Sequence, residues 1–116
     1  MYRALELQYV PPELREGRGE VEEAAEGRLP RLVAYEDLRG TFHCHTVHSD
    51  GRATVAEMAQ AARERGWRYL GIADHSPAAS YAGGLSAADV ERQHREIDDW
   101  NREHGAELWL FKGTEA

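Results

Sequence analysis

The segment FHCHTVHSDG, residues 42–51, combines several side chains that can bind a metal ion. His43 and His45 are separated by one residue, and in a β-strand such residues project from the same face, roughly 6–7 Å apart. Imidazoles at that spacing can converge on one metal ion or on two adjacent ions. Asp50 follows in a Ser-Asp-Gly turn, from which its carboxylate can swing back toward the end of the strand. The segment therefore predicts a metal site built on a strand and on the turn after it.

Two later motifs place similar side chains just after apolar stretches. Asp74-His75 follows residues 68–73, and Glu115 follows residues 108–111. Because the carboxyl ends of parallel strands meet at one edge of an α/β sheet, where ligands and catalysis gather, we expect these side chains to join the histidines there. A mixed set of imidazoles and carboxylates suits Mn²⁺ or Zn²⁺ better than Ca²⁺, and Mg²⁺ is a further candidate. The predicted metal ligands are His43, His45, Asp50, His75 and Glu115.

The strands expected to carry these residues cover residues 38–44, 68–73 and 108–111. A helix is predicted between successive strands, and such alternation is typical of parallel βαβ units. The sequence therefore predicts an α/β domain with three parallel strands. The second and third strands are almost continuously apolar, which predicts a sheet covered on both faces. Both an open doubly wound sheet and a (β/α) barrel fit this pattern.

Both predicted helices have a start signal at the residue before them. Thr54 and Glu57 form a capping-box pattern ahead of a helix expected over residues 55–65. Ser86 begins a second helix that we expect to end at Gly105.

The chain changes character near residue 38. Residues 9–14, YVPPEL, form an extended stretch fixed by two prolines, and a short polar helix is expected over residues 21–26. Apolar residues are too sparse in this part to build an independent core. We therefore expect residues 1–38 to be a tail or linker and residues 39–116 to be one domain.

Composition limits the classes of protein to which the chain can belong. With 14 basic and 21 acidic side chains the formal charge is −7, which argues against a nucleic-acid binder that works through a basic surface alone. Bound divalent cations can reverse the local field, so an enzyme that acts on phosphates is compatible with this charge. No apolar run approaches the roughly 18 residues of a membrane span, and a single cysteine, Cys44, fits a reducing compartment. We expect a cytoplasmic chain with no membrane partner.

Short motifs in the chain resemble those of a known family. Residues 43–45, 49–51, 74–76 and 113–115 read HCH, SDG, DHS and GTE, and they resemble the first three motifs of the PHP (polymerase and histidinol phosphatase) domain. More narrowly, residues 9–20, YVPPELREGRGE, resemble the segment that ends the polymerase thumb in bacterial-type family X DNA polymerases. The loop AGGLS, residues 82–86, is similar to that family's version too. The resemblance covers nearly the whole chain, with residues 1–38 as thumb end and linker and residues 39–116 as the N-terminal half of a PHP domain.

The resemblance implies a distorted (β/α)₇ barrel, of which this chain would supply the first three βα units, with a cluster of metal ions at its C-terminal mouth. It implies a metal-dependent phosphoesterase, a 3′-5′ exonuclease that processes DNA 3′ ends, within a DNA repair enzyme that is also a DNA-directed DNA polymerase. The partners are then DNA and the polymerase and later PHP segments of a longer chain. Because the family's later ligands lie in those segments, we expect the 116-residue chain by itself to be inactive. The residues that match the family's early metal ligands, and so become candidate catalytic residues, are His43, His45, Asp50, His75 and Glu115.

Two positions depart from the family pattern. Thr41 stands where the family often has aspartate, and Ala73 replaces a common threonine. Two other functions stay open: a stand-alone PHP phosphatase acting on small phosphate esters, in the manner of a histidinol phosphatase, and a non-catalytic structural PHP module. The PPEL segment counts against the stand-alone phosphatase.

Overall fold

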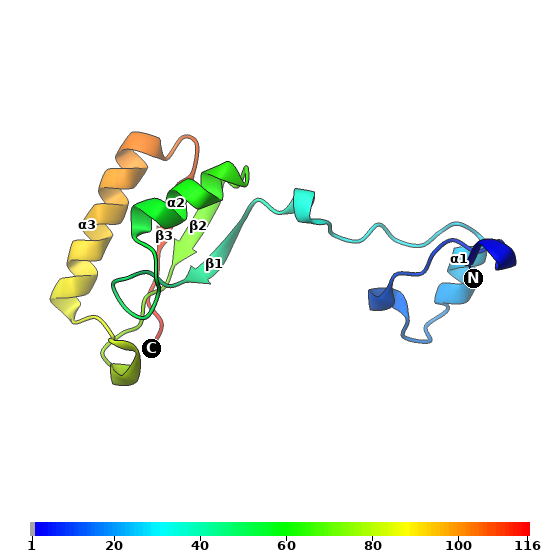
Figure 1. The fold of residues 1–116 in the computed structure, drawn as a ribbon, viewed down its shortest axis with the longest axis horizontal. Helices are drawn as coiled ribbons and strands as arrows, with labels where there is room; N and C mark the ends of the chain where they lie inside the picture. Colours follow the sequence, from blue (N-terminus) through cyan, green and yellow to red (C-terminus); the bar gives the residue numbers. More distant parts are fainter. Residues whose placement is uncertain (1) are drawn as a thin grey trace. The chain divides into compact units, whose positions relative to one another are not determined.

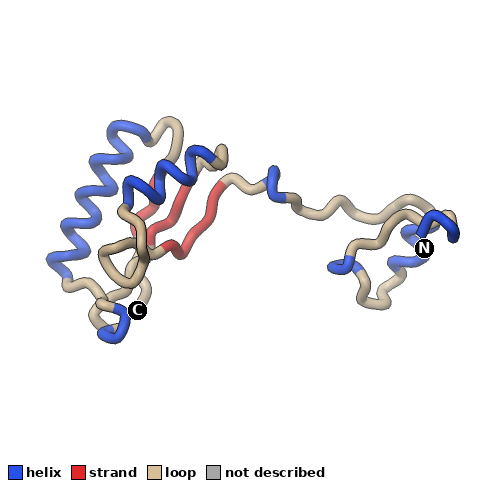
Figure 2. Tube along the Cα trace, in the orientation of Figure 1, coloured by secondary structure: helices blue, strands red, loops and turns tan. Residues whose placement is uncertain are grey.

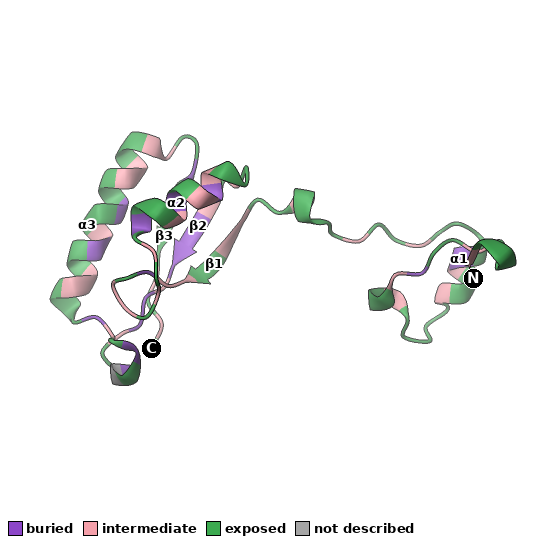
Figure 3. Cartoon of the chain, viewed as in Figure 1, coloured by how far each residue is buried: buried purple, intermediate pink, exposed green. Residues whose placement is uncertain are grey.

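A computed structural model describes residues 2–116, which separate into two compact units. The first unit ends at Ala34 and the second spans Tyr35–Ala116, close to the boundary expected at residue 38. Each unit has buried residues of its own, which Figure 3 shows in purple.

The first unit consists of short helices joined by irregular chain. Two 3₁₀ helices, Tyr2–Leu5 and Pro12–Leu14, precede helix α1, Glu20–Ala25 (Figure 1). Helix α1 matches the helix expected over residues 21–26 to within one residue at each end. Val10 and Ala24 are the buried apolar residues of this unit, so its core is small, although the sequence predicts no independent core here.

The second unit is built on three parallel strands, β1 (Gly40–Cys44), β2 (Tyr69–Ile72) and β3 (Trp109–Lys112). Their order in the sheet is β1-β2-β3 (Figures 1 and 2). The predicted α/β class and the parallel sheet are therefore confirmed. The first two strands are each two residues shorter than expected, and the third begins and ends one residue later.

Helices α2 (Val55–Glu64) and α3 (Ala87–His104) connect the strands. Each begins with a capping box: the hydroxyl of Thr54 or Ser86 accepts a hydrogen bond from the backbone N–H three residues later, and that residue's carboxylate accepts one from the N–H of the cap. Gly66, at φ 72°, follows α2 in a left-handed conformation that favours glycine. Within residues 2–116 no helix is both long and apolar enough to cross a membrane.

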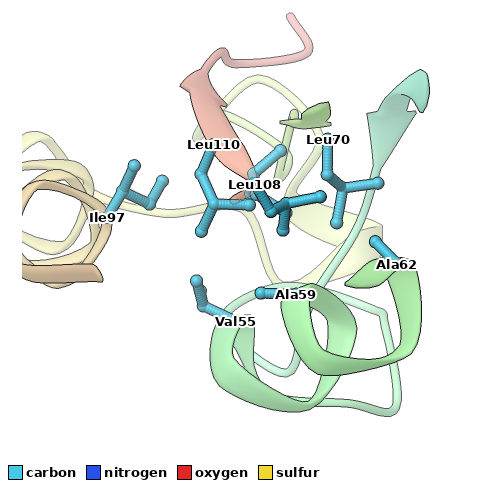
Figure 4. Close-up of a cluster of buried hydrophobic side chains, with 8 residues drawn as sticks. Val55, Ala59, Ala62, Leu70, Ile97, Leu108 and Leu110 are labelled. Atoms are coloured by element: carbon cyan, nitrogen blue, oxygen red, sulfur yellow. The ribbon is translucent and has the colours of Figure 1, made fainter. Parts of the chain in front are cut away.

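Helices α2 and α3 pack against one face of the sheet, and the core lies between them and the strands (Figure 4). Leu70 and Ile72 of β2 and Leu110 of β3 alternate along their strands and point toward the helices. Ala59 and Ala62 are small, so α2 can lie close to the sheet. The other buried members of this core are Val55, Ile97 and Leu108.

The opposite face of the sheet carries an aromatic cluster made of Phe42, Tyr69 and Phe111. Their ring centroids lie between 5.2 and 6.1 Å apart. Gly71 leaves room for this packing, because an added Cβ would lie 2.3 Å from the ring of Phe42. Phe42 is 58% exposed and Phe111 is 43% exposed. The prediction that both faces are covered is therefore wrong within residues 2–116, because both helices pack on the same side.

Asn101 on α3 contacts the outer edge of β3. Its amide nitrogen donates a hydrogen bond to the carbonyl of Leu110 (2.8 Å), and its Oδ1 accepts one from the N–H of Leu110 (2.8 Å). The side chain thus pairs with the edge strand as a neighbouring strand would, and part of that edge is closed to other chains.

We expect Asn101→Leu to lower the free energy of unfolding by about 1–3 kcal/mol, because it leaves two part-buried backbone groups of β3 without partners. Urea denaturation measures this change. Gln60→Leu, on an exposed position of α2, is the matched control and should change the stability by less than about 0.5 kcal/mol. Equal stabilities for the two variants would contradict the role assigned to Asn101.

Candidate metal centre

The pairing of β2 with β3 continues past the strand ends and aligns two of the predicted ligands. A parallel bridge joins His75 to Glu115. The backbone N–H of Glu115 donates to the carbonyl of Asp74 (3.2 Å), and the N–H of Ser76 donates to the carbonyl of Glu115 (2.7 Å). The two side chains therefore lie next to each other, with His75 Nδ1 3.1 Å from Glu115 Oε2.

Strand β1 contains a β-bulge at the first predicted histidine. Thr41 pairs with Leu70 and Cys44 pairs with Ile72, so β1 has one residue more than β2 over this stretch. His43 lies in the bulge with φ 63°, a left-handed conformation that is uncommon for residues other than glycine.

The bulge changes the side of the sheet on which the side chains of β1 pack. Phe42 packs in the aromatic cluster and Cys44 packs against the helix-side core, although residues two apart in a regular strand share a face. His43 and His45 still stack, with ring centroids 5.3 Å apart and planes inclined by 10°. The two imidazoles therefore converge as expected, but strand alternation is the wrong reason for it.

The turn after β1 folds back and returns Asp50 to the strand end. The N–H of Gly51 donates to the carbonyl of Thr46 (2.9 Å), and an added Cβ on Gly51 would lie 2.4 Å from the carbonyl oxygen of His45. Only glycine fits such a close approach. Asp50 Oδ1 lies 2.9 Å from His45 Nδ1, and its Oδ2 lies 3.4 Å from His75 Nε2. Asp50 thus bridges histidines that belong to the ends of two different strands.

Glu115 completes the arrangement from the end of β3. Its Oε2 lies 3.2 Å from His43 Nε2, 3.3 Å from His45 Nε2 and 3.1 Å from His75 Nδ1. All five predicted ligands, which come from the ends of three strands, therefore lie in one cluster at the carboxyl edge of the sheet.

The five side chains form two overlapping groups of potential ligands. One group is His43, His45 and Glu115, and the other is His45, Asp50 and His75; within each group the candidate ligand atoms all lie within 4.8 Å of one another. Metal–ligand bonds of about 2.0–2.2 Å can span such a set after small side-chain rotations. His45 belongs to both groups, because its Nδ1 faces Asp50 and its Nε2 faces Glu115.

Both carboxylates are held in their charged form. Hydrogen bonding with His43 lowers the pKa of Glu115 below its usual range, and the charges of the three neighbouring histidines add to this effect against the opposing effect of burial. Burial raises the pKa of Asp50, but the hydrogen bond with His45 and the charges of the adjacent histidines outweigh it, so the net shift is downward. Carboxylates that are already ionised can bind a cation without first releasing a proton.

A buried nitrogen in the cluster makes no hydrogen bond within residues 2–116. His75 is 8% exposed, and its Nδ1 has no hydrogen-bond partner although Glu115 Oε2 lies 3.1 Å away. Unpaired buried polar atoms are costly and therefore rare. The unpaired nitrogen and the donor set of three imidazoles and two carboxylates both fit a divalent cation.

Other residues that could bind a metal lie outside the cluster. His48 Nε2 lies 2.9 Å from Glu96 Oε2 on α3. The ring of His104 packs against Trp100, with centroids 4.5 Å apart. Cys44 packs against the core, and burial raises the pKa of its thiol. These contacts separate the three side chains from the candidate ligands.

Three polar residues beside the cluster are not among the residues predicted for the site. Thr46, Ser49 and Gln93 each donate a hydrogen bond to the carboxylate of Asp74. Nothing in the sequence distinguishes Thr46 from an ordinary turn residue, whereas Ser49 belongs to the SDG motif of residues 49–51. Gln93 does have a signal, because it lies four residues before Ile97 on the apolar face of α3, where a polar side chain is unusual.

The chain is similar to a curated bacterial protein over almost its whole length. No family model matches the chain. The DNA polymerase/3′-5′ exonuclease PolX of Bacillus subtilis (strain 168) is 35% identical over 114 residues, which are 98% of this chain. The chain is homologous to a segment of PolX. The match confirms the resemblance to bacterial-type family X polymerases, and the chain spans 20% of the length of PolX.

The shared position of His45 leads to a test by metal titration. We expect His43→Ala to weaken one ligand group and leave the other, whereas His45→Ala weakens both. The loss of Zn²⁺ affinity in His45→Ala should exceed the roughly 10- to 100-fold loss that is typical of residues that only support a ligand. Isothermal titration with Zn²⁺ measures the stoichiometry and affinity. His104→Gln, a histidine substitution outside the cluster, should bind as the unsubstituted chain does. If His45→Ala and His104→Gln bind equally well, the cluster is not the metal site.

Proposed function

We propose that this segment supplies the early ligands of a divalent-metal phosphoesterase site. The observation that carries the proposal is the convergence of three histidines and two carboxylates on one edge of a parallel sheet. A set rich in imidazole suits Mn²⁺ or Zn²⁺. Adjacent cations of this kind, when bound, activate water and stabilise the leaving oxygen in phosphoester cleavage.

The residues of the chain have distinct parts in this proposal. His45 would bind a cation through one ring nitrogen, and its other ring N–H would donate to the carboxylate that faces it, because each of its nitrogens faces a carboxylate. Asp50 and Glu115 would balance the charge of bound cations, and they orient the imidazoles that face them. His43 is the most exposed of the three histidines, so its side of the cluster would be the side open to a phosphate group.

The substrate that we propose is the 3′ end of DNA. PolX of B. subtilis carries the name DNA polymerase/3′-5′ exonuclease, and the identity of 35% extends over 114 residues. The formal charge of −7 leaves the chain without a broad basic surface. Contacts with the DNA phosphates would therefore come from bound cations and from other parts of a longer protein.

In the proposed domain arrangement, residues 1–38 are the end of a polymerase thumb and a linker, and residues 39–116 are the N-terminal half of a PHP barrel. The identity with PolX runs through both compact units, which supports the arrangement. The exposed aromatic face of the sheet supports it as well, because a barrel has helices outside and packed side chains inside. The longer protein would combine polymerase and 3′-end processing activities.

The test is a chimaera in which the 114 matching residues replace the corresponding segment of B. subtilis PolX. We expect the chimaera to degrade the 3′ end of a labelled primer in Mn²⁺, because the remaining ligands are then present. The 116-residue chain alone should show no measurable exonuclease. His75→Ala in the chimaera should abolish degradation and spare nucleotide addition, whereas His104→Gln should leave both activities intact.

Two outcomes would count against this function. A chimaera that extends primers but does not degrade 3′ ends would refute the exonuclease proposal. Faster hydrolysis of p-nitrophenyl phosphate than of DNA would instead favour a phosphatase that acts on small phosphate esters.

A further inference from the structure

A buried carboxylate next to the metal centre belongs to neither ligand group. Asp74 is 2% exposed and lies between the end of β2 and His75. Its Oδ1 accepts hydrogen bonds from the N–H of Thr46 (2.6 Å) and the hydroxyl of Ser49 (2.5 Å). Its Oδ2 accepts from the hydroxyl of Thr46 (2.7 Å) and from the side-chain amide of Gln93. Four donors fill the acceptor capacity of an ionised carboxylate.

Two of the three partner residues of Asp74 are as buried as the carboxylate itself, and the third, Ser49, is half-buried. Thr46 is 0% exposed and Gln93 is 1% exposed. A buried charge of this kind is costly unless it is fully hydrogen-bonded, and an apolar side chain would fill the same space at lower cost. Packing alone therefore does not account for an aspartate at this position.

The hydrogen bonds tie together the segments that carry the ligands. Thr46 directly follows His45, and Ser49 directly precedes Asp50. Asp74 itself directly precedes His75. A single carboxylate thus joins the turn that carries two candidate ligands to the strand end that carries a third.

We infer that Asp74 is a positioning residue that holds His45, Asp50 and His75 in ligand geometry before a cation binds. Gln93 braces the carboxylate from α3, and it is the only one of the three partner residues that lies outside the turn. The inference rests on the proposed metal site, because it assigns Asp74 a role toward that site's ligands. Residues that orient metal ligands in this way commonly contribute about 10- to 100-fold to metal affinity.

The test uses the full 116-residue chain and Co²⁺, whose visible absorption reports ligand geometry. Asp74→Asn keeps the shape of the side chain but presents an amide to two of the four donors, so Co²⁺ should bind about 10- to 100-fold more weakly, with an altered spectrum. Asp99→Asn makes the same chemical change at an exposed position of α3 and should have no effect.

A pair of substitutions at Thr46 separates positioning from packing. Thr46→Val keeps the volume and loses the hydroxyl donor, whereas Thr46→Ser keeps the hydroxyl and loses a methyl group. We expect Thr46→Val to weaken Co²⁺ binding and Thr46→Ser to bind Co²⁺ about as well as the unsubstituted chain. The opposite order would show that Thr46 only fills space, and it would overturn the inference. The two Thr46 variants also test the positioning role of Asp74 if Asp74→Asn does not fold.

A measurement on the metal-free chain separates this inference from the proposed function. Hydrogen exchange of the Thr46 amide should become about tenfold faster in Asp74→Asn, because a hydrogen bond to a charged acceptor is lost. Unchanged exchange together with unchanged Co²⁺ binding would refute the role of Asp74. If the unsubstituted chain does not bind Co²⁺, the metal site itself is refuted, and the exchange rates then decide whether Asp74 orders the turn.

Discussion

The backbone N–H of Glu115 donates a hydrogen bond to the backbone carbonyl of Asp74, and the carbonyl of Glu115 accepts one from the N–H of Ser76. The third strand therefore stays in register with the second beyond the end of the sheet. This pairing brings the carboxylate of Glu115 next to His75. The contacts that Glu115 makes with His43 and His45 depend on the same alignment. A shift of one residue would turn the Glu115 side chain to the other face of the sheet and remove the carboxylate that three imidazoles share.

The first strand reaches the same point through a distortion. His43 adopts a left-handed backbone, which for residues other than glycine costs roughly 1–2 kcal/mol. Bulges of this kind redirect side chains and are found near functional sites. Here the bulge lets Phe42 pack on one face of the sheet and Cys44 on the other, while both histidine rings remain at the sheet edge. The strained residue is thus also a candidate ligand.

The apolar core covers one face of the small sheet, whereas the candidate metal ligands lie at its carboxyl edge. The side chains between the sheet and helices α2 and α3 form the apolar core, which keeps the strand ends at fixed positions. The polar contacts around Asp74 lie next to this core and connect α3 to the turn after β1. Because a mobile turn would spread Asp50 over many positions, a rigid connection of this kind suits a site in which ligands from different strands must meet.

Local patterns in the sequence were enough to predict the helices and strands and to identify the candidate ligands. Capping boxes at Thr54 and Ser86 depend on residues three apart, so both helix starts could be predicted, and apolar runs located the strands. The position of His75 and Glu115 after those runs was sufficient to place them at one edge. Only the tertiary structure decided the bulge at His43, the single covered face of the sheet and the contact between Gln93 and Asp74. These features arise from pairing and packing between residues far apart in the chain, and a local pattern carries no information about such contacts.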